Sequence, residues 1–181
     1  MPKQLIAFTG LKGSGKDTAA EVLVGYGFKL LKFADSLKNM VRAYLRTNGI
    51  PEDMIERYIE GDMKEVPLDV WEGCSTRYIM QTLGTEWGRY KIGDSLWVNS
   101  FKRRAAVHDL VVCTDVRFND EVNVIRSLGG KVYRIVRPGQ ENNDMHESER
   151  GIILLNVAGE IVNDGSIADL HSKVKKVVLR R

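Results

Sequence analysis

A glycine-rich stretch near the amino terminus constrains this chain more than any other feature. The stretch GLKGSGKDT, residues 10–18, follows the apolar run 5–8 and leads into a helical pattern. A strand, a glycine turn and a helix in this order indicate a phosphate-binding loop, because glycines without Cβ atoms let successive backbone N–H groups curl around a phosphate. The helix behind the turn adds the positive end of its dipole. Lys16 supplies a point charge that can reach the β- and γ-phosphates of a nucleotide.

One position departs from the common pattern, which has Ser or Thr directly after the lysine. Here that position is Asp17, and Thr18 follows it. An acidic side chain beside a triphosphate is repelled unless it faces Mg²⁺ or the water bound to it. We therefore expect Asp17 to be an outer-sphere magnesium partner or a first-turn residue favoured by the helix dipole. The alternative is a turn that only packs a strand on a helix, and a strand-linked match with three glycines and a lysine argues against it.

Length and composition limit the class of protein. A chain of 181 residues predicts one domain with a sizeable core, and a net charge of +3 does not argue for a nucleic-acid partner. No apolar run approaches the length of a membrane span, and the amino terminus lacks the apolar core of a signal peptide. Cys74 and Cys113 form neither a disulfide framework nor a metal-binding spacing, and Cys113 is expected to be a small buried side chain. These features predict a cytoplasmic protein.

Apolar runs alternate with helical patterns along the chain. The predicted strands are residues 4–9, 29–33, 110–114, 131–136 and 160–162. The strongest runs are continuous rather than alternating, as in strands covered by helices on both faces, so we predict an α/β fold with a parallel five-stranded sheet flanked by helices. Ligands of such sheets bind at the carboxyl ends of the strands. Residues 9–10, 33–35 and 114–115 and Arg137 should therefore converge on one crevice.

Two insertions interrupt the alternation and set the expected organisation. The core is predicted to consist of residues 1–34 and 109–181, and a helical insertion occupies residues 35–108. A second insertion, at about residues 138–159, begins with a polar run and lies near the predicted crevice. Its position predicts a short lid, and its composition alone fits a disordered surface loop equally well.

An acid and an arginine follow the strand predicted at residues 110–114. In phosphate-binding α/β proteins an acid such as Asp115 at the end of a strand helps to organise Mg²⁺. Arg117, two residues further on, can hold a substrate phosphate through two parallel hydrogen bonds. The alternative for Arg117 is a surface salt bridge with Asp120 or Glu121.

Residues 75–90 predict a helix that begins at Ser75 or Thr76. Its expected apolar face consists of Met80, Leu83, Trp87 and Tyr90. A second face carries Arg77, Gln81, Gly84, Thr85 and Gly88. Small residues next to Arg and Gln suit a flat ligand that bears a phosphate, whereas the alternative is that the glycines allow close helix packing and Arg77 is solvated. Trp87 and Trp97 are expected in the core.

The polar loop carries acids, a histidine and two flanking arginines. Asp144, His146, Glu147 and Glu149 match no common zinc spacing, so we do not predict a zinc site. Arg137 and Arg150 flank the loop, and a lid arginine there could neutralise charge on a transferring phosphoryl group. Simple solvent exposure of both arginines is the alternative.

Five stretches together resemble the deoxynucleoside monophosphate kinases of tailed phages, within the P-loop NTPase fold. They are GSGKDT (13–18), FADSLK (33–38), QTLGTEWGR (81–89), TDVRFNDE (114–121) and NDGS (163–166). The resemblance implies transfer of the γ-phosphoryl group of ATP to a deoxynucleoside monophosphate with Mg²⁺. It also implies that the helical insertion binds the monophosphate and that the second insertion is the lid.

The resemblance also implies roles for individual residues. Those expected to bind ATP are Gly10, Lys12, Gly13, Ser14, Gly15, Lys16, Asp17, Thr18, Asn163 and Gly165. Those expected to bind the acceptor nucleotide are Asp35, Lys38, Arg77, Gln81, Asp115 and Arg117. Asp17, Thr18 and Asp115 are expected to hold Mg²⁺ through water. Lys16, Arg117 and a lid arginine, either Arg137 or Arg150, are the expected catalytic residues.

No general base is needed for this reaction, because the acceptor phosphate is already anionic at neutral pH. Two other functions remain open from the sequence. One is a kinase of the same fold that acts on a non-nucleotide phosphate, such as phosphomevalonate or dephospho-coenzyme A. The other is a nucleotide-binding switch, although the chain has no Asn-Lys-x-Asp motif that would read guanine. The accepted bases and the oligomeric state, including a homodimer, are left open; if the protein is phage-encoded, it would act in the host cytoplasm.

Overall fold

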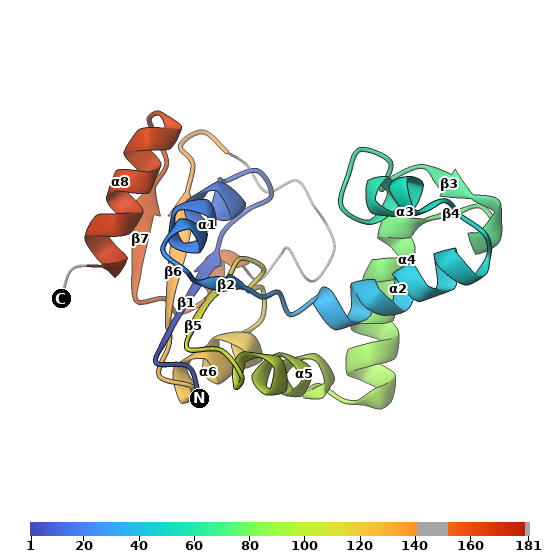
Figure 1. Ribbon diagram of the computed structural model, residues 1–181, viewed down its shortest axis with the longest axis horizontal. Helices are drawn as coiled ribbons and strands as arrows, with labels where there is room; N and C mark the ends of the chain where they lie inside the picture. The colour runs from blue at the N-terminus through green and yellow to red at the C-terminus, as the bar shows by residue number, and fades with distance from the viewer. Residues whose placement is uncertain (141–151, 180–181) are drawn as a thin grey trace. The chain divides into compact units, whose positions relative to one another are not determined.

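Short apolar segments pair into one parallel sheet in the computed structural model, which describes residues 1–140 and 152–179 (Figure 1). Within these residues the sheet has five strands in the order β2-β5-β1-β6-β7. The strands are β1 (Gln4–Thr9), β2 (Lys29–Leu30), β5 (Leu110–Cys113), β6 (Lys131–Val136) and β7 (Gly159–Val162). The predicted parallel α/β sheet is confirmed, and only β2 is clearly shorter than expected, since its pairing with β5 covers two residues.

The strands of this sheet send alternate side chains into two helix layers. Leu5 and Ala7 of β1 face one core cluster, and Ile6 and Phe8 face another. The first cluster is covered by α5 (Leu96–Ala105) and α6 (Asn119–Ser127). The second is covered by α1 (Lys16–Gly25) and α8 (Ile167–Val178). Burial on both faces explains why β1 and β5 are continuous apolar runs.

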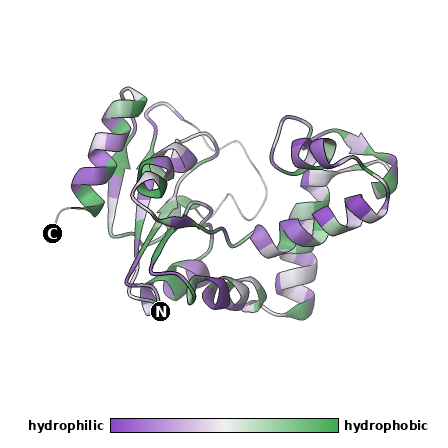
Figure 2. Ribbon diagram, in the orientation of Figure 1, coloured by the Kyte–Doolittle hydropathy of each residue, from purple (hydrophilic) through white to green (hydrophobic). Residues whose placement is uncertain are grey.

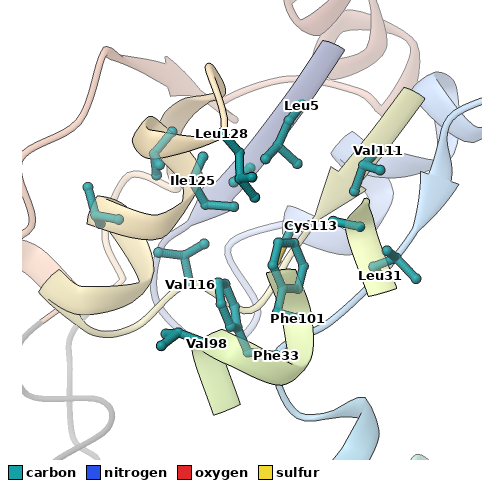
Figure 3. Close-up of a cluster of buried hydrophobic side chains, with 14 of the residues drawn as sticks. Leu5, Leu31, Phe33, Val98, Phe101, Val111, Cys113, Val116, Ile125 and Leu128 are labelled. Atoms are coloured by element: carbon teal, nitrogen blue, oxygen red, sulfur yellow. The ribbon is translucent and has the colours of Figure 1, made fainter. Parts of the chain in front are cut away.

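An aromatic pair anchors α5 against the residues that follow β2 (Figure 3). The rings of Phe33 and Phe101 stack with centroids 4.2 Å apart, and both side chains are buried. Arg104, one turn further along α5, donates a hydrogen bond of 2.6 Å to the carbonyl of Lys32. Helix α5 thereby fixes the segment that leaves the carboxyl end of β2. Cys113 is buried in the same cluster, as predicted.

The chain divides into two compact units, residues 1–33 with 98–181 and residues 34–97. The second unit contains α2 (Asp35–Thr47), α3 (Glu52–Ile59), α4 (Thr76–Thr82) and a small antiparallel pair, β3 (Pro67–Leu68) with β4 (Cys74–Ser75). Its core comes from helical spacing of apolar residues: Leu37, Val41 and Leu45 on α2 and Ile55 and Ile59 on α3 are all buried.

A short 3₁₀ turn occurs in each unit, at Asp69–Trp71 in the second and at Ile152–Leu154 in the first.

Most helices carry a hydrophilic and a hydrophobic side, which Figure 2 shows as two colours on the same helix. On α8, for example, the buried positions are Leu170, Val174 and Val178, at a spacing of four residues. None of the helices described in the structure combines the length and the hydrophobicity that crossing a bilayer requires.

The helix predicted at residues 75–90 begins as expected and then changes its winding. Ser75 is the N-cap, and its hydroxyl accepts the backbone N–H of Tyr78. Residues Leu83–Ile92 form a π-helix, in which the N–H of Gly93 donates to the carbonyl of Gly88, five residues back. The wider turn rotates the side chains away from α-helical spacing. The predicted burial of Trp87 is therefore wrong: this side chain is 39% exposed.

The π-helix instead buries Thr85, Gly88 and Arg89. Trp97 packs directly on Gly88, and its indole N–H donates to the carbonyl of Gly84 at 2.7 Å. A methyl group at Gly88 would lie 2.5 Å from Nε1 of Trp97. The sequence left two interpretations of the glycines on this helix: room for a flat ligand, or close packing against a neighbouring segment. At Gly88 the structure shows close packing, against Trp97.

We expect Gly88→Ala to lower the free energy of unfolding. The added methyl group collides with a buried indole ring, which costs about 2–3 kcal/mol, while alanine regains at most about 1 kcal/mol of helix propensity. The matched control is Gly84→Ala, whose methyl group would meet Leu37 at an ordinary 3.4 Å. Urea unfolding followed by tryptophan fluorescence measures the difference, because Trp71, Trp87 and Trp97 all lie in this unit. Equal stability of the two variants would contradict the packing argument.

Candidate functional site

The turn between β1 and α1 packs so tightly against the sheet that it requires glycines. We call residues 10–15 the glycine loop. Gly10 has φ 141° and a methyl group there would lie 2.4 Å from the carbonyl oxygen of Ile135 in β6. Gly15 has φ 101°, and a methyl group there would lie 2.6 Å from Nδ2 of Asn163. Both positions combine a left-handed backbone with a close approach to another segment, so side chains are excluded.

Helix α1 begins at Lys16, immediately after this loop, and points its amino end at it. Its N-cap is Gly15, which offers no side chain to cap the first N–H groups of the helix. The first backbone bond of the helix runs from Ala19 N–H to the carbonyl of Gly15. The preceding amides and the helix dipole therefore favour an anion at this end.

Two polar side chains of the loop region, those of Lys16 and Ser14, differ in their hydrogen bonding. Nζ of Lys16 lies 2.7 Å from the carbonyl oxygens of both Gly10 and Leu11, so the charged end of the side chain folds back over the loop. Ser14 is 1% exposed, and its hydroxyl has no hydrogen-bond partner among the residues that the structure describes. A buried hydroxyl without a partner beside a ring of amides is a group that a bound anion would satisfy.

Asp17 pairs with side chains of residues that follow β5 and β2. The hydroxyl of Thr114 donates to Oδ1 of Asp17 at 2.7 Å, and Nζ of Lys32 lies 2.9 Å from the same oxygen. Partial desolvation raises the pKa of Asp17, but the hydrogen bond from Thr114, the ion pair with Lys32 and the charge of Lys16 outweigh it and lower the pKa below its ordinary value. The carboxylate is therefore ionised at neutral pH.

The carboxyl ends of β1, β2 and β5 are tied together by polar contacts. Oδ1 of Asp115 accepts the backbone N–H of Phe33 at 2.9 Å and the thiol of Cys113 at 3.2 Å. The hydroxyl of Thr9 donates to the carbonyl of Val116 at 2.7 Å. Burial, together with the charge of Asp115, raises the pKa of the Cys113 thiol well above its usual range, so this thiol stays protonated.

Arg117 and Arg137 both follow the carboxyl ends of strands, Arg117 after β5 and Arg137 after β6. Arg117 follows Val116, which Thr9 holds at the end of β1, and its backbone N–H donates to the buried carboxylate of Glu121 at 2.7 Å. Nη1 of Arg137 lies 3.5 Å from the carbonyl oxygen of Gly13. Arg150 and half of the expected lid, residues 141–151, lie outside the described residues.

Four residues that the resemblance assigns to the acceptor lie in the unit of residues 34–97. Asp35 begins α2, and Gln81 is half-buried in α4. Nζ of Lys38 lies 2.7 and 2.9 Å from the two carboxylate oxygens of Glu60. Nε of Arg77 lies 3.3 Å from a carboxylate oxygen of Glu65, so this arginine is ion-paired within its own unit.

Lys32 and Gln140 help to hold the site together and were not predicted: Lys32 pairs with Asp17, and the amide of Gln140 donates to the carbonyl of Lys12. Thr9 and Thr114, which were expected at the crevice, bond to Val116 and Asp17. Asn163 was expected to bind ATP, and in the structure its amide donates to the carbonyl of Ser14 at 2.9 Å. Thr9 and Thr114 could be recognised from their places at strand ends. Gln140 and Lys32 give no such signal in the sequence, because their partners depend on the order of the strands.

Comparison with known proteins identifies relatives of this chain. The profile of the deoxynucleotide monophosphate kinase family matches residues 46–174. A putative deoxynucleotide monophosphate kinase of Acanthamoeba polyphaga mimivirus is 32% identical, over 94% of this chain and 93% of that protein. The deoxynucleotide monophosphate kinase of Escherichia phage RB69 is 33% identical over 80% of this chain, and the match spans 64% of its length.

Solved structures agree on the fold. TT1252 from Thermus thermophilus superposes with a TM-score of 0.51 at 17% identity and covers 99% of this chain and 97% of its own. A gluconokinase from Sinorhizobium meliloti 1021 gives a TM-score of 0.50 at 13% identity, over 98% of this chain and 93% of its own. Identity this low supports only the shared P-loop fold. With the family profile covering most of the sequence, the chain belongs to the deoxynucleotide monophosphate kinase family of phosphoryl-transferring enzymes.

Proposed function

We propose that this protein transfers the γ-phosphoryl group of ATP to the phosphate of a deoxynucleoside monophosphate. An anionic oxygen of the acceptor forms a bond to the γ-phosphorus, the bond from that phosphorus to the bridging oxygen breaks, and ADP leaves with the electron pair. The observation that carries this proposal is the tightly packed glycine loop with Lys16 folded over it, in a member of this kinase family. Its amides and the amino end of α1 suit the phosphates of ATP.

The carboxylates near the loop fit a magnesium ion. Mg²⁺ prefers oxygen ligands and takes one or two protein carboxylates together with substrate phosphates and water. Asp17 is ionised and lies in the first turn of α1, next to Thr18, and Asp115 lies at the end of β5. We assign these three residues to the ion, with Asp17 shared between the ion's water shell and Lys32. A bound Mg²⁺ would neutralise charge on the phosphates.

The acceptor phosphate needs positive charge rather than a base. Its oxygen is already anionic, so the protein contributes positioning and charge neutralisation. We assign Arg117 to the acceptor phosphate, because the contact between Thr9 and Val116 fixes the neighbouring backbone at the end of β1. Arg137, beside Gly13, is the described arginine that we assign to the transferring group, and Arg150 is a second candidate outside the described residues. Asp35, Lys38, Arg77 and Gln81 are assigned to the rest of the acceptor, so that the unit of residues 34–97 binds the monophosphate.

An acceptor screen tests the proposed function itself. Purified protein with ATP and Mg²⁺ is given each deoxynucleoside and ribonucleoside monophosphate, and also dephospho-coenzyme A and phosphomevalonate. Release of ADP coupled to NADH oxidation reports turnover. We expect turnover with at least one deoxynucleoside monophosphate at a kcat/KM well above that of the non-nucleotide acceptors. Turnover confined to a non-nucleotide acceptor, or tight ATP binding without turnover on any of them, would contradict the proposal.

Replacing Lys16 should remove most of the catalysis and leave the fold intact. Lys16→Ala deletes a charge that stabilises the transferring phosphoryl group, so kcat should fall roughly 100- to 1,000-fold. The control is Lys131→Ala, which removes an exposed lysine at the opposite end of the sheet, where β6 begins. The coupled ADP assay measures kcat, and circular dichroism checks the fold. Turnover of Lys16→Ala within a few-fold of the control would refute this role.

Replacing Arg117 should weaken use of the acceptor more than use of ATP. Arg117→Ala removes a charge-assisted hydrogen-bond donor to the acceptor phosphate, so kcat/KM for the monophosphate should fall by about 100-fold. The Kd for ATP, measured by titration calorimetry, should stay unchanged. Arg126→Ala is the control, since Arg126 is exposed in the last turn of α6. A large loss of ATP affinity with an unchanged KM for the monophosphate would place Arg117 on the donor instead.

A further inference from the structure

The carbonyl groups of the glycine loop are held from outside by side chains of two distant segments. Nδ2 of Asn163, the residue after β7, donates to the carbonyl of Ser14 at 2.9 Å. Nε2 of Gln140, four residues after the end of β6, donates to the carbonyl of Lys12. We call Asn163 and Gln140 the amide clamp. Two carbonyls of the loop that Lys16 does not contact are therefore bound by the clamp.

Holding a carbonyl also fixes the N–H group on the same peptide. A trans peptide unit is planar, so its C=O and N–H point in opposite directions. The bond from Asn163 to the carbonyl of Ser14 therefore directs the N–H of Gly15, and the bond from Gln140 to the carbonyl of Lys12 directs the N–H of Gly13. Because the carbonyls of Lys12 and Ser14 point out of the loop to the clamp, the N–H groups of Gly13 and Gly15 point into it.

The Asn163 half of the clamp is tied into the sheet. The backbone N–H of Asn163 donates to the carbonyl of Val136 at 2.7 Å, which ties the residue to the end of β6. A methyl group at Gly15 would lie 2.6 Å from Nδ2 of Asn163, and one at Gly13 would lie 3.3 Å from Nε2 of Gln140. The amide of Asn163 thus occupies the space that a side chain at position 15 would need, and the amide of Gln140 would be in tight contact with a Cβ atom at position 13.

We propose that Asn163 and Gln140 are positioning residues that preorganise the amides of Gly13 and Gly15 for the donor's phosphates. The proposal rests on the proposed function, and it gives Asn163 a role that does not depend on the base of the donor. A neutral amide suits this role, because it donates to a carbonyl without adding charge beside Lys16. An aspartate at position 163 would place an acceptor against an acceptor and push the Ser14 carbonyl away.

Binding of inorganic tripolyphosphate tests the clamp without the base or the chemistry. We expect Asn163→Ala and Gln140→Ala each to weaken binding of tripolyphosphate, ATP and GTP by the same factor, about five-fold for one lost hydrogen bond. Asn163→Asp should weaken binding at least as much. Because both residues hold one loop, the double variant should lose less than the product of the two single losses. Titration calorimetry at fixed Mg²⁺ measures each Kd.

The matched control is Gln4→Ala. Gln4 also donates from its side-chain amide to a backbone carbonyl, that of Val178, and it lies at the start of β1, at the opposite end of the strand from the loop. Its loss should leave tripolyphosphate binding unchanged, and thermal melting should show similar stability for all single variants. Loss of affinity for ATP alone would mean that Asn163 reads the adenine, and unchanged tripolyphosphate affinity in the clamp variants would overturn the proposal. A wild-type protein that binds neither tripolyphosphate nor ATP would instead refute the proposed function.

Discussion

The close approach of Gly10 to the carbonyl of Ile135 is the constraint on which the rest of the site depends. The contact is between two backbones, and neither can move without breaking the pairing of β1 with β6, in which Phe8 lies beside Tyr133 and Thr9 beside Arg134. The glycine loop must therefore leave β1 along the carboxyl end of β6. As a result its peptides pass within hydrogen-bond distance of residues that follow β6 and β7.

The same edge of the sheet has to accept polyanionic ligands although it carries two carboxylates. Each of them is held by donors from a neighbouring segment: Asp17 by Thr114 and Lys32, and Asp115 by the backbone N–H of Phe33. These bonds fix where the negative charge lies and offset part of its repulsion of a phosphate. They also couple the first turn of α1 to the ends of β2 and β5, so that the position of the loop and the position of β5 are not independent.

Much of the fold could be predicted from the sequence, because burial on both faces leaves a clear pattern. β1 and β6 have the predicted bounds, and the loop glycines could be recognised from their place between a strand and a helix. The region of Trp87 could not be predicted, because α-helical spacing was assumed where Trp97 packing on Gly88 accompanies a wider winding. Sequence spacing reports periodicity within a segment, whereas this winding depends on a contact with the start of another helix.

The supporting residues of the site were beyond prediction for a related reason. Lys32, Gln140 and Asn163 are ordinary polar residues, and their contacts exist only once the strand order β2-β5-β1-β6-β7 is known. Asn163 was expected to bind ATP through the family resemblance, which does not say which group of the chain its side chain meets. In the structure its amide donates to the carbonyl of Ser14. A resemblance transfers position along the chain, and the partner of a side chain still has to come from the structure.

The requirement for glycine in the loop then has two separate causes. A positive φ alone can be adopted by Asn or Asp at modest cost. At Gly15 the second cause decides, because the space for a Cβ atom is filled by the amide of Asn163. Gly15 and Asn163 therefore act together. Because Gly15 has no side chain, the amide of Asn163 can approach the loop and donate to the carbonyl of Ser14. For a reaction that needs no general base, the accuracy with which such peptides are held sets how well the phosphates are aligned.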